Sequence, residues 1–150
     1  MTCSIRLAEP GDLDRIGAIT AASYLDGGHL PAGDDYVATL RDAPTRAEQA
    51  ELWVAVRDGE LVGSVTFVPP GSPLEEVSDP AEAEVRMLAV SAVAQGQGVG
   101  ELLVRHCLRR AGELGLEGIA LSTLPSMTSA HRLYERLGFV RTPARDWSPV

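Results

Sequence analysis

The sequence contains no lysine and no asparagine, and only two of its 150 residues are cysteine. A chain without lysine cannot carry the Gly-x-x-x-x-Gly-Lys-Ser/Thr loop that binds nucleotide phosphates. Cys3 and Cys107 lie far apart, which indicates neither a disulfide framework nor a metal cluster. The three histidines, at positions 29, 106 and 131, show no ligand spacing. We therefore expect no metal site in this protein.

Long apolar runs are also missing, which argues against a membrane-spanning segment. The first residues lead directly into a strand-like pattern, without a basic and then apolar leader. We therefore expect a cytoplasmic protein with no membrane partner. The net charge of -8 argues against nucleic acid and suits a cationic or neutral amine better. With 45% hydrophobic content, residues 1–150 are expected to form one domain with a substantial core.

The most informative feature is a glycine-rich hexapeptide at residues 95–100, which reads Gln-Gly-Gln-Gly-Val-Gly. It follows a strand-like apolar run at residues 85–90 and opens an amphipathic helix at residues 101–110. Glycines at such a junction let main-chain N–H groups gather around an anion, and the helix dipole adds positive potential there. The pattern predicts a loop that cradles a pyrophosphate; the alternative is a glycine-rich turn without a ligand.

The glycine spacing separates this loop from the dinucleotide-binding kind. A Gly-x-Gly-x-x-Gly fingerprint is followed by an acidic residue at the end of the next strand. Here Gly96, Gly98 and Gly100 alternate with other residues, and the next strand ends in Ser122 and Thr123. A dinucleotide is therefore excluded as the expected ligand.

A third pattern, Gln/Arg-x-x-Gly-x-Gly/Ala, is matched in full by Gln95, Gly98 and Gly100. In this respect the loop resembles the acetyl-coenzyme A pyrophosphate loop of the GNAT superfamily of N-acetyltransferases. A second motif, Ala-x-x-Leu-Tyr-Glu-x-Leu-Gly-Phe at residues 130–139, resembles the closing signature of the same superfamily. The resemblance covers residues 4 to about 141, because the expected element order, β-α-α-β-β-β-α-β-α-β, is that of the superfamily's domain.

The resemblance implies an α/β (α+β) fold with a mixed central sheet of about six strands and helices on both faces. The sheet is expected to splay between the strand at residues 83–90 and the strand at residues 118–123. The usual final strand is missing or truncated, since Pro143 and Pro149 interrupt residues 140–150. A truncated copy, an imperfect substitute from this segment, or a partner chain in a homodimer are the alternatives.

The resemblance also assigns the donor site, which would hold acetyl-CoA. The main-chain N–H of Leu88, at a strand bulge, would polarise the thioester carbonyl. Coenzyme A is a polyanion, so loop amides and nearby arginines must hold it against the overall negative charge. The expected contacts are Met87, Leu88, Ala89 and Val90 for the pantetheine arm, and Gln95, Gly96, Gln97, Gly98, Val99, Gly100 and Glu101 for the pyrophosphate. Arg105, Arg132 and Arg136 are further candidates for the phosphates.

One expected donor contact departs from the family pattern. Relatives often carry asparagine seven positions before the tyrosine of the closing motif, where this chain has Met127. That contact is then lost, or is supplied by Ser126 or Ser129.

Acetyl transfer to an amine needs a base for the amine and an acid for the departing thiolate. Glu84 matches the position of a general base in one branch of the superfamily, and Glu82, on the same strand face, is the alternative. A third interpretation places both carboxylates on a solvated strand face. Tyr134 matches a tyrosine that protonates the thiolate; it can equally be a core aromatic, because Ala130, Leu133 and Leu137 form one helical stripe with it.

The acceptor is expected near the first two helices and the long loop at residues 69–80, where relatives build acceptor sites. Tyr24, His29 and Tyr36, with Asp34 and Asp35, would make an aromatic, acidic pocket for a cation, unless the two aspartates only cap the second helix.

The function that these features predict is acetyl transfer from acetyl-CoA to a primary amine. The amine would belong to a small molecule or a peptide N-terminus and would attack the thioester directly in a ternary complex. A non-catalytic acyl-CoA-binding sensor or regulatory module is the alternative.

Overall fold

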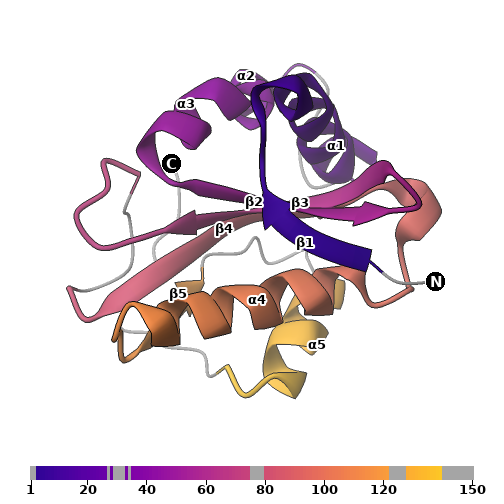
Figure 1. Cartoon of the computed structure of the whole chain (residues 1–150). Coiled ribbons are helices and arrows are strands. Elements are labelled where there is room, and N and C mark those ends of the chain that lie inside the picture. Colours follow the sequence, from indigo (N-terminus) through magenta and orange to yellow (C-terminus); the bar gives the residue numbers. More distant parts are fainter. Residues whose placement is uncertain are drawn as a thin grey trace.

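The fold is built on one mixed sheet whose strands lie side by side in chain order (Figure 1). The computed structural model describes residues 3–74 except 27, 29–32 and 34, then residues 80–121 and 128–139. The strands are β1 (Cys3–Leu7), β2 (Glu51–Arg57), β3 (Glu60–Val68), β4 (Glu82–Val90) and β5 (Gly118–Leu121). The first three junctions are antiparallel and the β4–β5 junction is parallel. The predicted mixed sheet is confirmed.

Helices cover both faces of this sheet, as the sequence predicted (Figure 1). On one side lie the short 3-10 helix η1 (Pro10–Asp12), α1 (Leu13–Asp26), α2 (Tyr36–Arg41) and α3 (Ala43–Gln49). The chain then passes through the 3-10 helix η2 (Ala92–Ala94) to α4 (Val99–Glu113) and α5 (Thr128–Arg136), which lie on the other side. Within the described residues, no helix combines the length and apolarity needed to cross a membrane.

Five strands are described where about six were predicted. The predicted sixth strand, beginning at residues 139–141, falls mostly outside the described residues, as does the whole segment 140–150. The expectation of a truncated final strand and the alternative of a homodimer therefore stay predictions.

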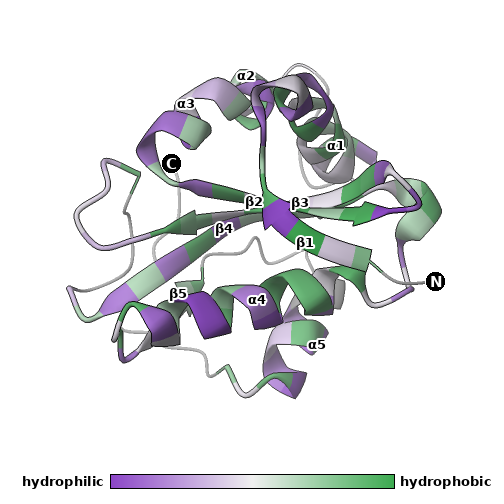
Figure 2. Ribbon diagram, in the orientation of Figure 1, coloured by the Kyte–Doolittle hydropathy of each residue, from purple (hydrophilic) through white to green (hydrophobic). Residues whose placement is uncertain are grey.

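Two apolar clusters lie on the two faces of the sheet. In Figure 2, hydrophobic (green) residues alternate with hydrophilic (purple) ones along the strands and along α4. One cluster packs Val99, Leu103 and Cys107 of α4 against the sheet, and all three are almost fully buried. The other packs Ile16 and Ile19 of α1 against the opposite face. Burial of these side chains holds both helices in place, since each contributes about 1.5–3 kcal/mol when fully removed from water.

The approach of α4 to the sheet is closest at Gly63 of β3. A methyl group placed there would lie 2.9 Å from Val99 Cγ1 and 3.2 Å from Leu103 Cδ1. The hydrogen of glycine is therefore what allows the first turn of α4 to rest directly on β3.

Two aspartates shape the helix boundaries on this side of the sheet. The carboxylate of Asp12 accepts from the Glu9 N–H at 2.7 Å within a 3-10 turn, and α1 follows. The chain bends at Asp42, whose carboxylate accepts from the Thr45 N–H at 3.2 Å, so that α3 starts as a helix separate from α2. Pro44 fits here because a first-turn residue needs no N–H partner.

Candidate active site

The sheet opens where the sequence predicted its splay. Parallel pairing joins Glu82–Val85 of β4 to Gly118–Leu121 of β5, and in the described residues it ends there. Strand β4 nevertheless runs on to Val90, still paired to β3 on its other side. The last part of β4 therefore offers a strand edge that can pair with an extended ligand.

A bulge interrupts β4 within this open part. Ser64 faces Ala89 and Thr66 faces Arg86, so Met87 and Leu88 share the place opposite a single β3 residue. Met87 has a φ of 53°, a left-handed conformation that side chains other than glycine seldom adopt. Bulges of this kind re-aim side chains and main-chain groups beside functional sites. The structure therefore has a bulge where the predicted role of the Leu88 N–H requires one.

The two bulge residues face opposite sides of the sheet. Met87 packs with Ala21 and Leu40 beneath α1 and α2. Leu88 packs with the cluster beneath α4. The bulge therefore contacts the helices on both faces of the sheet, α1 and α2 through Met87 and α4 through Leu88.

The glycine loop lies against the Leu88 side of this bulge. Gly96 and Gly98 have φ values of 76° and 83°, and Gly98 is the residue before the first turn of α4. The loop residues 95–98 are exposed, and a helix start leaves main-chain N–H groups without partners inside the helix. A Cβ placed on Gly100 would lie 3.7 Å from Leu88 and 3.5 Å from Leu133 of α5. The loop therefore fits a pyrophosphate whose attached arm runs along β4.

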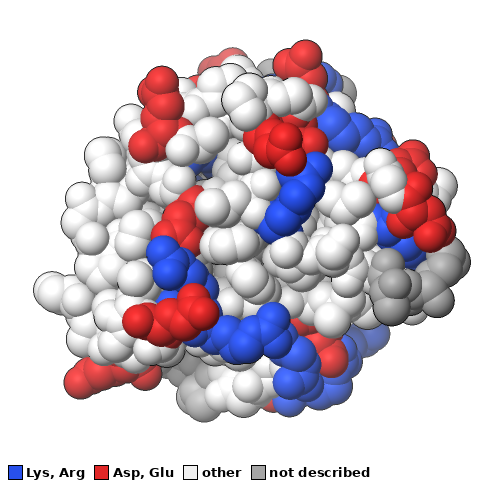
Figure 3. Space-filling model, in the orientation of Figure 1, with Lys and Arg blue, Asp and Glu red and all other residues white. Residues whose placement is uncertain are grey.

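Glu101 places a negative charge in the first turn of α4, and two arginines offset it. Its carboxylate accepts from Arg136 Nη2 of α5 at 2.8 Å and from Arg105 Nε at 3.2 Å. The Arg136 hydrogen bond, followed by that from Arg105, lowers the pKa of Glu101. Positive and negative side chains mix along the lower part of Figure 3, although the chain as a whole is acidic. Two of the three predicted phosphate arginines are thus at the loop.

Among the remaining predicted donor contacts, the two loop glutamines make hydrogen bonds with described residues, whereas the side chains predicted just before and at the start of α5 lie outside the described residues. Gln95 donates to the Val90 carbonyl at 3.4 Å, which ties the loop to the end of β4. Gln97 accepts a hydrogen bond from Arg57. Ser126 and Met127 lie outside the described residues, and so does the side chain of Ser129.

Tyr134 is held by the turn that ends α5. The N–H groups of Gly138 and Phe139 donate to the carbonyls of Glu135 and Tyr134, at 3.0 and 2.9 Å, which is the Schellman pattern. This turn sets the Phe139 ring edge-on to the Tyr134 ring, with centroids 5.7 Å apart. Burial raises the pKa of Tyr134, and the nearby Tyr24 and Cys107 raise it further. The phenol therefore stays protonated at neutral pH, as both the core and the proton-donor interpretations require.

Glu84 is fully buried, so the solvated-face interpretation is wrong for this residue. It lies in mid-sheet, opposite Val68 of β3 and Ala120 of β5. Its Oε2 is 3.7 Å from Arg86 Nε on the same strand face. Glu82 is half-buried two residues earlier. Which of them acts as a base stays a prediction.

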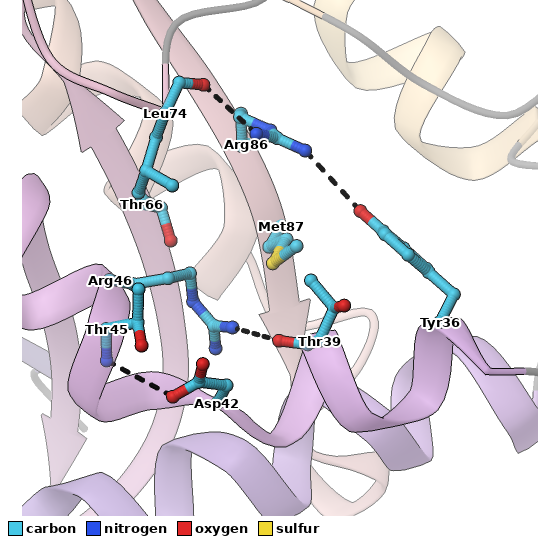
Figure 4. A pocket seen from close by; sticks show the side chains of 9 residues that line it. All are labelled: Tyr36, Thr39, Asp42, Thr45, Arg46, Thr66, Leu74, Arg86 and Met87. Atoms are coloured by element: carbon cyan, nitrogen blue, oxygen red, sulfur yellow. Dashed lines mark hydrogen bonds between the residues drawn. The ribbon is translucent and has the colours of Figure 1, made fainter.

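An open cavity of about 210 Å³ lies on the Met87 side of the bulge (Figure 4). It is lined from α2, α3, β3, β4 and the segment after β3, by Tyr36, Thr39, Asp42, Thr45, Arg46, Thr66, Leu74, Arg86 and Met87. Tyr36 is the predicted acceptor residue found here. The Tyr24 ring packs edge-on to the Tyr36 ring, with centroids 6.4 Å apart, and burial raises the pKa of Tyr24 to about 12.

The predicted acidic character of this pocket stays a prediction. Asp35 is exposed and does not line the cavity, while His29 and Asp34 lie outside the described residues. The lining carries one carboxylate, Asp42, and two guanidinium groups.

Sequence reasoning missed both guanidinium residues, Arg46 and Arg86. Arg86 could have been found from its spacing, because residues 82, 84 and 86 are all charged and alternate residues of a strand lie on one face. The signal for Arg46 was its position three residues after Ala43, on the side of a short helix that is buried. No group of three or more His, Cys, Asp or Glu side chains suited to a metal occurs in the described part of the chain.

Comparisons with known proteins agree with this geometry. The model of the acetyltransferase (GNAT) family matches residues 18–139. A mycothiol acetyltransferase of Cellulomonas flavigena is 36% identical over 117 residues, which cover 69% of this chain and 32% of that protein. The chain therefore spans about a third of the length of this curated relative.

Solved structures share the fold over the whole chain. A predicted acetyltransferase from Clostridium acetobutylicum, crystallised with acetyl-CoA, has a TM-score of 0.75 at 14% identity, covering 99% of this chain and 96% of that one. A transcriptional regulator from Bacillus halodurans has a TM-score of 0.73 at 25% identity, covering 99% of both chains. Because the family match includes the bulge, the glycine loop and the closing motif, this chain belongs to the GNAT family of acetyltransferases.

Proposed function

We propose that the protein transfers an acetyl group from acetyl-CoA to a primary amine of a small molecule or a peptide N-terminus. The observation that carries the proposal is the bulge of β4. Leu88 contacts the glycine-loop side and Met87 lines the cavity, so a donor and an acceptor bound on the two sides would meet at one main-chain position.

The chain's residues have defined tasks in this reaction. The loop and the start of α4 hold the pyrophosphate through N–H groups, and the Leu88 N–H stabilises the negative charge that develops on the thioester oxygen. The amine nitrogen forms a bond to the acetyl carbon while the carbon–sulfur bond breaks. The amine loses its proton, through a water, to Glu84, and the Tyr134 hydroxyl protonates the departing sulfur before recovering a proton from solvent.

The buried position of Glu84 favours proton transfer from the amine through a water over direct contact between the amine and the carboxylate. Glu84 does not line the cavity, whereas Arg86, which lies 3.7 Å from it, does. A water beside Arg86 would therefore connect the amine with the carboxylate. Tyr134, held neutral by burial, can donate a proton without first being made acidic.

The test is release of the coenzyme A thiol from acetyl-CoA in the presence of amines, amino acids and N-terminal peptides. Glu84→Gln and Tyr134→Phe should each lower kcat by about 100-fold or more. Binding of coenzyme A, measured by calorimetry, should change little in either variant. Glu48→Gln, at an exposed carboxylate of α3, is the control and should retain full activity. No thiol release above background with any amine would refute the proposal.

A non-catalytic acyl-CoA-binding module is the second candidate. It is favoured by the likeness to the Bacillus halodurans protein, which is named a transcriptional regulator. A module of this kind would bind coenzyme A and show no turnover. Its affinity for coenzyme A would be unchanged by Glu84→Gln and by Tyr134→Phe.

A further inference from the structure

Among the described residues, the lining of the cavity beside the bulge carries more guanidinium groups than carboxylates, whereas an amine-binding pocket would be expected to be negative. Arg46 reaches it from α3 and Arg86 from β4, two elements far apart in the sequence (Figure 4). Among the described lining residues, the only carboxylate is that of Asp42, which accepts a hydrogen bond from the Thr45 N–H at the start of α3. The lining therefore favours an anionic group over a second cation.

Arg46 is buried to an unusual degree for a charged side chain, with 4% of its surface exposed. Its Nη1 donates to the Thr39 carbonyl at 2.9 Å and its Nη2 to the Leu40 carbonyl at 3.1 Å. These bonds satisfy carbonyls at the end of α2 and explain why the side chain turns inward. They are contacts with neutral groups, however, and do not neutralise the charge.

One nitrogen of the Arg46 guanidinium takes no part in this structural role. The Nε of Arg46 is buried and makes no hydrogen bond with any described residue. Burial lowers the pKa of Arg46, against the smaller opposing attraction of Asp42. A buried donor without an acceptor, on a buried cation, is costly unless a ligand completes it.

Arg86 brings a second guanidinium to the same cavity. Its Nη1 donates to the Leu74 carbonyl at 3.1 Å, and its Nη2 lies 3.5 Å from the Tyr36 hydroxyl. The hydrogen bond to the Leu74 carbonyl holds the Arg86 side chain at the cavity. The Glu84 carboxylate, on the same strand, lies 3.7 Å from the Arg86 Nε. Two fixed guanidinium groups match a planar carboxylate, which accepts paired hydrogen bonds from arginine.

We propose that this cavity binds the carboxylate of the acceptor, so that the substrate is an amine that also carries a carboxylate, as an amino acid does. Arg46 Nε and the Arg86 guanidinium would hold the carboxylate, leaving the amine to face the bulge. The cavity volume of about 210 Å³ leaves room for a group of amino-acid size. This inference rests on the proposed acetyl transfer and narrows its acceptor.

The experiment compares amines that differ only in the carboxylate. Thiol release is measured with glycine, alanine and phenylalanine and with the three corresponding amides. The acids should have kcat/KM values about 10- to 100-fold higher than the amides, the effect of a charge-assisted hydrogen bond. Equal values, or faster reaction of the amides, would overturn the inference while leaving acetyl transfer in place.

Arg46→Met tests the residue itself, because methionine keeps an unbranched apolar stem and removes the charge. The variant should lose the preference for acids, because its kcat/KM for the acids falls to about the value for the amides. Arg41→Met, at an exposed arginine of α2, is the matched control and should keep the preference. A preference for acids that survives Arg46→Met in a folded protein would overturn the assignment.

A binding measurement keeps the inference testable if no amine is acetylated or if Arg46→Met does not fold. N-acetylglycine and its amide are titrated against the wild-type protein in the presence of coenzyme A. Binding of the acid at least tenfold tighter than that of the amide supports the carboxylate site. Equal binding, or none, refutes it, whatever the outcome for acetyl transfer.

Discussion

The contact between Gly63 and the start of α4 makes the position of the glycine loop sensitive to a single methyl group. In Gly63→Ala the new Cβ would lie 2.9 Å from Val99 Cγ1, where carbon atoms normally stand about 3.5 Å apart or more. The helix must therefore withdraw by about 0.6 Å, the difference between these two distances. Val99 and Leu103 are 2% and 0% exposed, so neither side chain has free space to turn into.

The magnitude follows from two opposing effects. Overpacking of this kind costs about 1–3 kcal/mol, and replacing glycine by alanine returns about 0.4–1 kcal/mol by restricting the unfolded chain. We expect a net loss of about 1–2 kcal/mol in the free energy of unfolding. For a chain of this size the melting temperature should fall by about 2–8 °C.

Urea unfolding and a thermal scan measure this loss directly, and Gly112→Ala provides the matched control. Gly112 is an exposed residue of α4 with no atom within 4 Å of the position of a Cβ. Alanine there should stabilise the helix by up to about 1 kcal/mol. Because Val99 directly follows Gly98, the Gly63→Ala variant should also bind coenzyme A more weakly than wild type. A Gly63→Ala protein as stable as wild type would refute the described approach of α4.

Three further outcomes are expected. Gly17→Ala places a Cβ 2.5 Å from a main-chain carbonyl oxygen of α2, so it should displace α2 and raise the KM for the amine acceptor while leaving the KM for acetyl-CoA unchanged. Asp12 accepts hydrogen bonds from Arg6, which lower the pKa of Asp12. Its contribution to stability is therefore present above the unfolded pKa of about 3.9 and lost as pH falls through the lower folded pKa, so the stability gap between wild type and Asp12→Asn should close in urea titrations from pH 6 to pH 2. Burial raises the pKa of Cys107 to about 12, so mass spectrometry should find this thiol unmodified by iodoacetamide at pH 8 in the native protein and alkylated in urea, and equal labelling in both would contradict its burial.

Much of the donor side was predictable because its backbone conformation depends on residues that are close together in the sequence. The φ values of Gly96 and Gly98 are ones that glycine adopts freely, so the loop is recognisable from spacing alone. The closing motif is local in the same way, since Gly138 ends α5 and turns Phe139 back onto Tyr134. Within the described residues, the expected order of elements along the chain matches the observed one, apart from α3, which is separate from α2.

The acceptor side was predictable only in part, because its residues meet through long-range packing. Tyr36 was expected near the acceptor and lines the cavity. The acidic pocket stays a prediction, because Asp35 is exposed and does not line the cavity, whereas His29 and Asp34 lie outside the described residues. The buried state of Glu84 was also decided by its neighbours, because a mid-sheet position flanked by β3 and β5 cannot be told from an edge position by alternation alone.

The sequence by itself determined the family, the donor loop and the layered order of helices and strands, because these depend on backbone preferences and on periodicity that each segment carries alone. Only the tertiary structure decided which side chains line the cavity beside the bulge. Folding brings Arg46 of α3 and Arg86 of β4, 40 positions apart in the sequence, to this cavity, and the burial of their charges there depends on the elements that surround them.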